Sequence, residues 1–258
     1  MTSASSTLPK PPRLQWRIFA LLWLLGMPGM AALVWQIVPQ WLYTHSVPLD
    51  PAYSPVQQLV VLASVLALAV GMGVLLAPRV GLAAPVLTTW IAGRSPREAL
   101  ERMWLPGVAG GIAGAAWLVT LAVLWPDTLR AVEPLYAMPL LPKLLYGSLT
   151  SELLVRWGML ACVFWGVWRL SGRQQAPSLA LGWLAVVLGA LLWALAHWLI
   201  AFWLLGALPD VMLLHLMLGR IVYGLMAGFL CWRFGLEAAL LAHGLTDVLA
   251  HRLIGPVL

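Results

Sequence analysis

Hydrophobic residues occur along this chain in long continuous runs that are separated by short polar segments. A helix needs about 20 apolar residues to cross the hydrocarbon layer of a membrane, and each run is close to that length. The runs do not alternate apolar and polar residues, as the strands of a membrane β-barrel do. The pattern therefore predicts an all-α, polytopic membrane helix bundle with about seven transmembrane spans. The predicted spans are 16–38, 56–76, 105–125, 143–168, 179–205, 211–232 and 235–254.

The segment 81–102, between the second and third spans, predicts an eighth, re-entrant or surface element. Its first part is apolar but is interrupted by Pro85, and we expect it to dip into the bilayer. In its second part Ser95 and Glu98 have the spacing of a helix capping box, with Pro96 at the first helical position. These residues predict a short amphipathic helix on the membrane surface.

Composition supports a membrane protein and excludes a water-soluble core. Hydrophobic residues make up 62% of the 258 residues and charged residues only 9%, whereas a soluble domain has roughly 25% charged residues. The polar segment 1–15 is predicted to be a disordered cytoplasmic tail. The apolar run after it is too long for the core of a signal peptide, so we interpret it as an uncleaved first span.

Basic residues set the predicted orientation. They occur singly at the ends of the apolar runs, so the formal net charge of +6 does not indicate a nucleic-acid partner. Ten Lys and Arg residues fall on one side of the predicted bundle, and three (Arg130, Lys143 and Arg252) fall on the other. The side richer in basic residues faces the cytoplasm. We therefore expect an integral protein of a bacterial inner membrane with a cytoplasmic N-terminus.

Ionisable residues lie inside four of the predicted spans. They are Glu152 and Arg156 in the fourth, His197 in the fifth, Arg220 in the sixth, and His243 and Asp247 in the seventh. With a helical rise of ~1.5 Å per residue, all six lie about 10–20 Å from the predicted outer ends, in one layer. Two acids balance two arginines there. We expect Arg220 to point into this layer and to pair with Asp247 or Glu152.

The residues alone leave two interpretations of this layer open. Glu152 and Arg156 are four residues apart, as are His243 and Asp247, so each pair shares one helix face. Either pair alone is explained equally well as a structural contact. All six groups in one layer favour a functional site, because ionisable groups are costly inside a membrane. We predict that spans four to seven form one bundle centred on Glu152, His197, His243 and Asp247.

Three motifs in this region resemble the CPBP (Abi) family of intramembrane glutamic proteases, which includes the CAAX-processing endopeptidases. The family patterns are EExxxR, FxxxH, and HxxxN or HxxxD. Here they correspond to Glu152 with Arg156, Trp193 with His197, and His243 with Asp247. The resemblance covers about 143–254, and it implies a catalytic core there, with 16–125 as scaffold spans.

The resemblance also implies a role for each residue. In the family, the first glutamate of EExxxR and the histidine of FxxxH activate a water molecule, and the last histidine and its partner stabilise the oxyanion. His197 would then be the partner of the base, and His243 and Asp247 would stabilise the oxyanion. Arg156 would hold the acid-bearing helix. Ser151 occupies the position of the first glutamate, so either Glu152 acts as the base or the site lacks one.

The expected function is hydrolysis of peptide bonds in membrane-associated or CAAX-like substrates, without a cofactor or a metal. The expected partners are a peptide or membrane-protein substrate and the lipid bilayer, with no nucleic acid. One alternative is a catalytically impaired family member that acts as a binding, chaperone or immunity protein. Others are a metal-dependent protease using His197, His243 and an acid, a proton-coupled transporter, and a serine nucleophile at Ser151 or Ser148.

Overall fold

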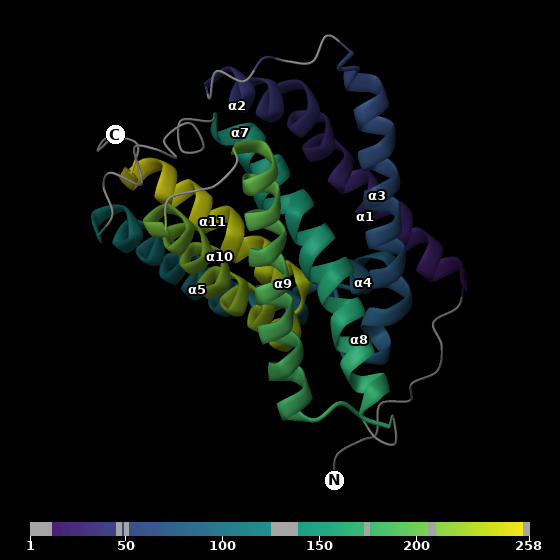
Figure 1. Ribbon diagram of the computed structural model, residues 1–258. Coiled ribbons are helices and arrows are strands. Elements are labelled where there is room, and N and C mark those ends of the chain that lie inside the picture. The colour runs from purple at the N-terminus through teal and green to yellow at the C-terminus, as the bar shows by residue number, and fades with distance from the viewer. Residues whose placement is uncertain are drawn as a thin grey trace.

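The structure is a computed structural model that describes residues 12–44, 48, 52–124, 139–172, 176–205 and 210–254. This part of the chain is almost entirely helical, which confirms the all-α bundle (Figure 1). The first half comprises α1 (Pro12–Ala32), η1 (Leu33–Ile37), α2 (Val38–Thr44), α3 (Pro55–Leu76), η2 (Ala77–Arg79), α4 (Pro85–Ile91) and α5 (Arg97–Leu124). The second half comprises α7 (Leu140–Lys143), η3 (Leu144–Thr150), η4 (Leu153–Met159), α8 (Leu160–Leu170), α9 (Leu179–Leu205), α10 (Asp210–Phe234) and α11 (Leu236–Ile254).

Six helices of the described part are long and apolar enough to cross a membrane. They are Leu14–Tyr43, Pro55–Arg79, Arg97–Leu124, Leu140–Leu170, Leu179–Trp203 and Asp210–Phe234. The seventh predicted span forms a helix, α11, but it is not among the six, and it carries Glu237, Asp247 and Arg252. Residues 1–11 of the expected tail 1–15 lie outside the part of the chain that the structure describes.

The segment 81–102 differs from its prediction in two ways. Pro85 does not interrupt a helix but begins one, α4, because a proline at the first helical position needs no hydrogen-bond acceptor for its nitrogen. The predicted surface helix is not a separate element either. Its residues are the first turns of α5, which runs on through Pro106 to Leu124.

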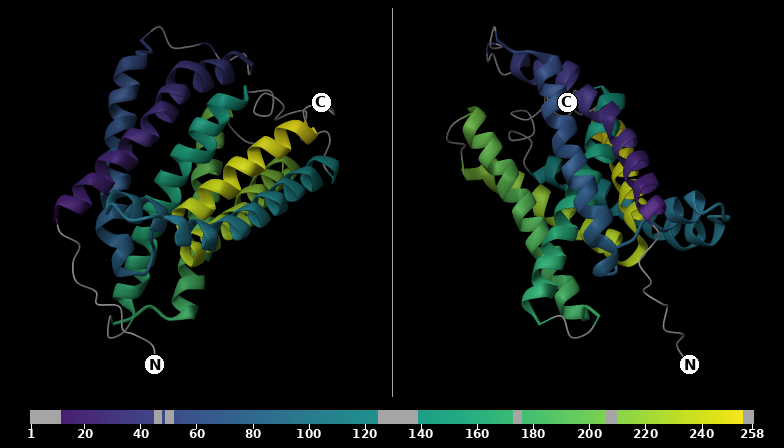
Figure 2. Two further views of the ribbon diagram at one scale, coloured as in Figure 1. Left: turned by 180° about the vertical axis from the view of Figure 1, so that it is seen from behind. Right: turned by 90° about the vertical axis from the view of Figure 1, so that its right-hand side faces the viewer.

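The helix Leu140–Leu170 lies at the centre of the bundle. Its first half packs against α1 and α11, and its second half packs against α3, α9 and α10. Leu153, Leu160 and Phe164 are fully buried in the resulting core. Figure 2 shows α5 and α11 side by side on one flank and α9 at one edge against α10. The segment 16–125, expected as scaffold, therefore packs directly against the segment 143–254, expected as catalytic core, since α5 packs along α11.

Glycines set the closest helix contacts. Gly107 and Gly111 of α5 face α11, where an added Cβ atom would lie 2.8 Å from Leu241 and 2.6 Å from Leu245. In α3, an added Cβ atom at Gly73 would overlap the indole of Trp157. These contacts let the helix backbones approach closely, as small residues do in membrane bundles.

Replacing Gly73 with alanine should therefore destabilise the protein. The methyl group has no space beside Trp157, and such overpacking costs about 1–3 kcal/mol. Gly166→Ala is the matched control, because no atom lies within 4 Å of its added Cβ atom and removing a helical glycine gains about 0.5–1 kcal/mol. Unfolding in detergent, followed by tryptophan fluorescence, measures both. Equal stability of the two variants would contradict the close contact.

Candidate active site

The helix that carries the first motif is wound unusually around Ser151 and Glu152. The segments Leu144–Thr150 and Leu153–Met159 on either side of these residues are π-helical. The Ser151 N–H accordingly donates to the Tyr146 carbonyl, five residues back. Such turns are rare and are frequent at functional sites. The helix is therefore irregular at this motif, although Glu152 and Arg156 still share one face, as their spacing predicted.

Glu152 connects two helices through its two carboxylate oxygens. Its side chain is buried, at 1% exposure. Oε2 lies 3.5 Å from the Arg156 Nε atom, one turn along the same helix. Oε1 lies 2.8 Å from the His243 Nδ1 atom of α11. Glu152 is thus held by its own arginine and also reaches the third motif.

Asp247 forms the second half of the same cluster. It lies near the far edge of the His243 ring, 4.0 Å from the Nε2 atom. The Ser148 hydroxyl donates to Asp247 Oδ2 at 2.7 Å, and the Lys143 Nζ atom lies 3.5 Å from Oδ1. Two carboxylates, Glu152 and Asp247, are therefore balanced by two cations, Arg156 and Lys143. Neutrality of this kind is what a buried polar layer requires.

Arg220 differs in part from its prediction. Its charge acts on the Tyr146 hydroxyl and on the His197 ring, so it lies near the predicted layer. The expected ion pair with Asp247 or Glu152 is not found among the described residues, whose ion pairs join Asp247 to Lys143 and Glu152 to Arg156. Lys143, which begins the predicted fourth span on its outer side, takes the expected place.

The second motif keeps its own internal contact. The Trp193 carbonyl lies 3.2 Å from the His197 Nδ1 atom, and the two rings meet edge to face with centroids 4.1 Å apart. This contact fixes the ring of His197 on α9. Within the described chain, His197 makes no hydrogen bond or ion pair with Glu152 or His243. Its role as a partner of the base stays a prediction.

Ser151 is buried beside Glu152 but does not join the cluster. Its hydroxyl donates to the Gly147 carbonyl of its own helix. Ser151 supplies no carboxylate, and the acid that reaches α11 is Glu152.

Comparison with known proteins gives one match. Residues 133–249 match the family model for type II CAAX prenyl endopeptidase Rce1-like proteins. This stretch contains all three motifs. The resemblance to the CPBP family is confirmed. No curated protein and no solved structure matches the chain.

Three residues of the Rce1-like region join the site in roles that the sequence did not predict, Ser148 having been considered only as a nucleophile. Lys143 and Ser148 both contact Asp247, although residues five apart are about 140° apart around an α-helix. The π-helical winding explains how they share a face. The third is Tyr223 of α10, whose ring centroid lies 4.6 Å from that of His243. Tyr223 lies three positions after Arg220, and that helical spacing was the available signal.

The hydroxyl of Tyr223 is buried beside the Thr246 side chain of α11, with which it interacts. It lies within electrostatic reach of Glu152, Arg156 and Asp247. The Glu152 Oε2 atom is buried without a hydrogen bond in this part of the chain, since its contact with Arg156 is long. The Rce1-like region thus holds a buried hydroxyl and an unused carboxylate oxygen in one layer. No group of three or more His, Cys, Asp or Glu side chains placed to hold a metal ion occurs among the described residues.

The buried ion pair gives a stability prediction. Arg156→Met leaves the Glu152 carboxylate without its nearest cation and should lower the free energy of unfolding by about 3–5 kcal/mol. Adding Glu152→Gln should recover most of that loss, because no uncompensated charge then stays buried.

The matched control is Arg97→Met, which breaks an exposed pair with Glu101 and should cost less than about 1 kcal/mol. Unfolding in detergent of the natural protein, the two single variants, the double variant and the control measures these differences. If the changes in the free energy of unfolding caused by the Arg156 and Glu152 substitutions are additive, the two side chains are not coupled.

Proposed function

We propose that this protein is an intramembrane endopeptidase that hydrolyses peptide bonds of membrane-associated, CAAX-like substrates. The observation that carries the proposal is the 2.8 Å contact between Glu152 and His243. The two residues are 91 positions apart and come from two different motifs. They meet in a buried, charge-balanced cluster inside the Rce1-like region.

The proposed chemistry uses Glu152 as the base. Hydrolysis needs a proton acceptor for water, donors for the oxyanion, and a proton for the leaving amine. Glu152 Oε2 accepts a proton from water, and the resulting hydroxide attacks the peptide carbonyl carbon. The proton then passes to the amine nitrogen as the C–N bond breaks. The Glu152–His243 hydrogen bond orients the carboxylate for this role.

Donors in the same layer support the oxyanion assignment. His243 is held between Glu152 and Asp247, and Asp247 is itself fixed by Ser148 and Lys143. The buried hydroxyl of Tyr223, beside the His243 ring and the Thr246 side chain, is a further donor. His197, oriented by Trp193, is proposed to position the water from the α9 side. We further propose a bacterial inner-membrane location with the N-terminus in the cytoplasm, which the distribution of basic residues supports.

Ser151 supports a second candidate, a family member that binds substrates without cleaving them. Its hydroxyl is engaged with its own helix and supplies no base. In that case the Glu152–His243 contact is structural, and the protein acts as a binding, chaperone or immunity protein.

Cleavage assays separate the two candidates. Purified protein in proteoliposomes is given a peptide ending in a CAAX-type sequence, with and without a prenyl group, and products are identified by mass. Under the protease proposal, Glu152→Gln and His197→Ala abolish cleavage, and Ser151→Glu raises it. Unchanged cleavage by His197→Ala would reject the glutamic-protease mechanism. If only the Ser151→Glu variant cleaves the peptide, and the natural protein binds it without cleaving it, the protein is the catalytically impaired family member.

Tyr223→Phe tests the additional donor. Removing one oxyanion donor lowers kcat by about 100-fold or more, and KM should change little because the ring stays in place. Tyr53→Phe is the control, since that hydroxyl donates to the Val34 carbonyl away from the site. Equal kcat values for the two variants would remove Tyr223 from the mechanism.

A further inference from the structure

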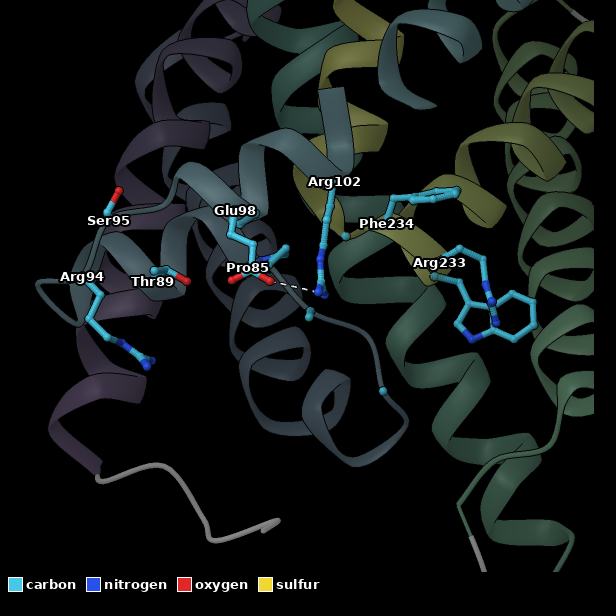
Figure 3. A pocket seen from close by; sticks show the side chains of 13 residues that line it. Pro85, Thr89, Arg94, Ser95, Glu98, Arg102, Arg233 and Phe234 are labelled. Atoms are coloured by element: carbon cyan, nitrogen blue, oxygen red, sulfur yellow. Dashed lines mark ion pairs between the residues drawn. The ribbon is translucent and has the colours of Figure 1, made fainter. Parts of the chain in front are cut away.

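A cavity of about 680 Å³ lies away from the polar cluster, at the junction of α4, α5, α10 and α11 (Figure 3). Gly235, in its lining, precedes Asp247 by twelve residues, which is ~18 Å along α11. The cavity is therefore separate from the proposed active site. Its walls come from the turn before α4, the start of α5 and the end of α10.

The wall of the cavity is firmly built. The Leu236 N–H donates to the Ala83 carbonyl at 2.9 Å, which joins the start of α11 to the turn before α4. The Glu237 carboxylate accepts the Leu87 N–H at 2.9 Å and so caps α4 from 150 residues away. Gly235, with a φ angle of 101°, lies so close to Pro85 that an added Cβ atom would be 2.5 Å away. The cavity is thus a fixed feature of the bundle.

The charge of the lining is positive. Three arginines and one glutamate contribute charged side chains: Arg94, Arg102, Arg233 and Glu98. Arg102 and Glu98 form an ion pair at 2.9 Å, which cancels both charges. Figure 3 shows this pair in the middle of the cavity, with Arg94 on one side and Arg233 on the other. Neither of these two outer arginines has an ion pair in the described part of the chain.

The position of the cavity indicates which kind of anion pairs with these two arginines. It lies at the ends of membrane-length helices, and the large exposed indoles of Trp90 and Trp104 are close by in sequence. Exposed tryptophans at helix ends lie at the level of the lipid headgroups. Basic pockets at that level bind anionic headgroups. The volume is many times the ~30 Å³ that one water molecule occupies, so a whole headgroup has room.

We propose that this cavity binds an anionic phospholipid headgroup, attracted by the positive charges of Arg94 and Arg233 on its two sides. The Ser95 and Thr89 hydroxyls in the lining supply further donors. A soluble phosphate compound offers the same chemistry, and the exposed tryptophans favour the lipid because they place the site at the membrane surface.

Lipid binding by the full-length, delipidated protein in neutral detergent tests this assignment. Native mass spectrometry measures the binding of phosphatidylglycerol, phosphatidylcholine and inorganic phosphate, and thermal unfolding followed by tryptophan fluorescence gives a second readout. We expect phosphatidylglycerol to bind roughly tenfold more tightly than phosphatidylcholine and to raise Tm. Arg94→Gln with Arg233→Gln should abolish this preference. Arg17→Gln with Arg97→Gln, which removes the same charge outside the lining, should keep it.

Several outcomes would overturn the proposal. One is equal binding of phosphatidylglycerol and phosphatidylcholine by the natural protein. Another is a loss of the phosphatidylglycerol preference in the control pair as large as in the double variant. The third is a rise in Tm with inorganic phosphate equal to the rise with phosphatidylglycerol. If the double variant does not fold, Ala99→Phe, which fills the cavity without changing charge, should lower binding of phosphatidylglycerol to the level of phosphatidylcholine. Retained preference in that variant would also reject the site. Because the readout is binding, the result does not depend on whether the protein cleaves peptides.

Discussion

A carboxylate buried in an apolar bundle needs a positive partner, because the low dielectric of the interior makes an isolated charge prohibitively costly. Glu152 meets this requirement through Arg156 on its own helix and His243 on α11. Asp247 meets it through Lys143, again across two helices. The same interactions that make these charges tolerable therefore hold the central helix against α11. Site and fold are stabilised by one set of contacts.

The π-helical winding of the central helix decides which side chains take part. It brings Lys143 and Ser148 to the same carboxylate and leaves Ser151 bonded to its own backbone. Irregular backbone of this kind is tolerated inside a membrane because each N–H still finds a carbonyl within the helix. Glu152 is thereby directed at His243. This geometry explains how Glu152, beside the engaged Ser151, comes to lie against the third motif.

Helix α11 links two distinct regions of the molecule. Near its start, Glu237 and Leu236 hold α4 in place and so form the wall of the basic cavity. Further along, His243 and Asp247 complete the polar cluster. Leu241 and Leu245 of this helix pack on the glycines of α5, so the helix is firmly fixed between the two regions. A headgroup bound in the cavity would stabilise the helix that carries half of the site.

The hydrophobic pattern by itself determined the helical membrane architecture, and α9 runs over the predicted residues 179–205. Helix length and apolarity are local properties, so composition suffices for them. The three motifs likewise identified Glu152 and His243 as members of one site. Only the tertiary structure placed Lys143 rather than Arg220 beside Asp247. That choice depends on helix winding and on the rotation of each helix about its axis, which are set by packing between helices and are not encoded in the spacing along any one of them.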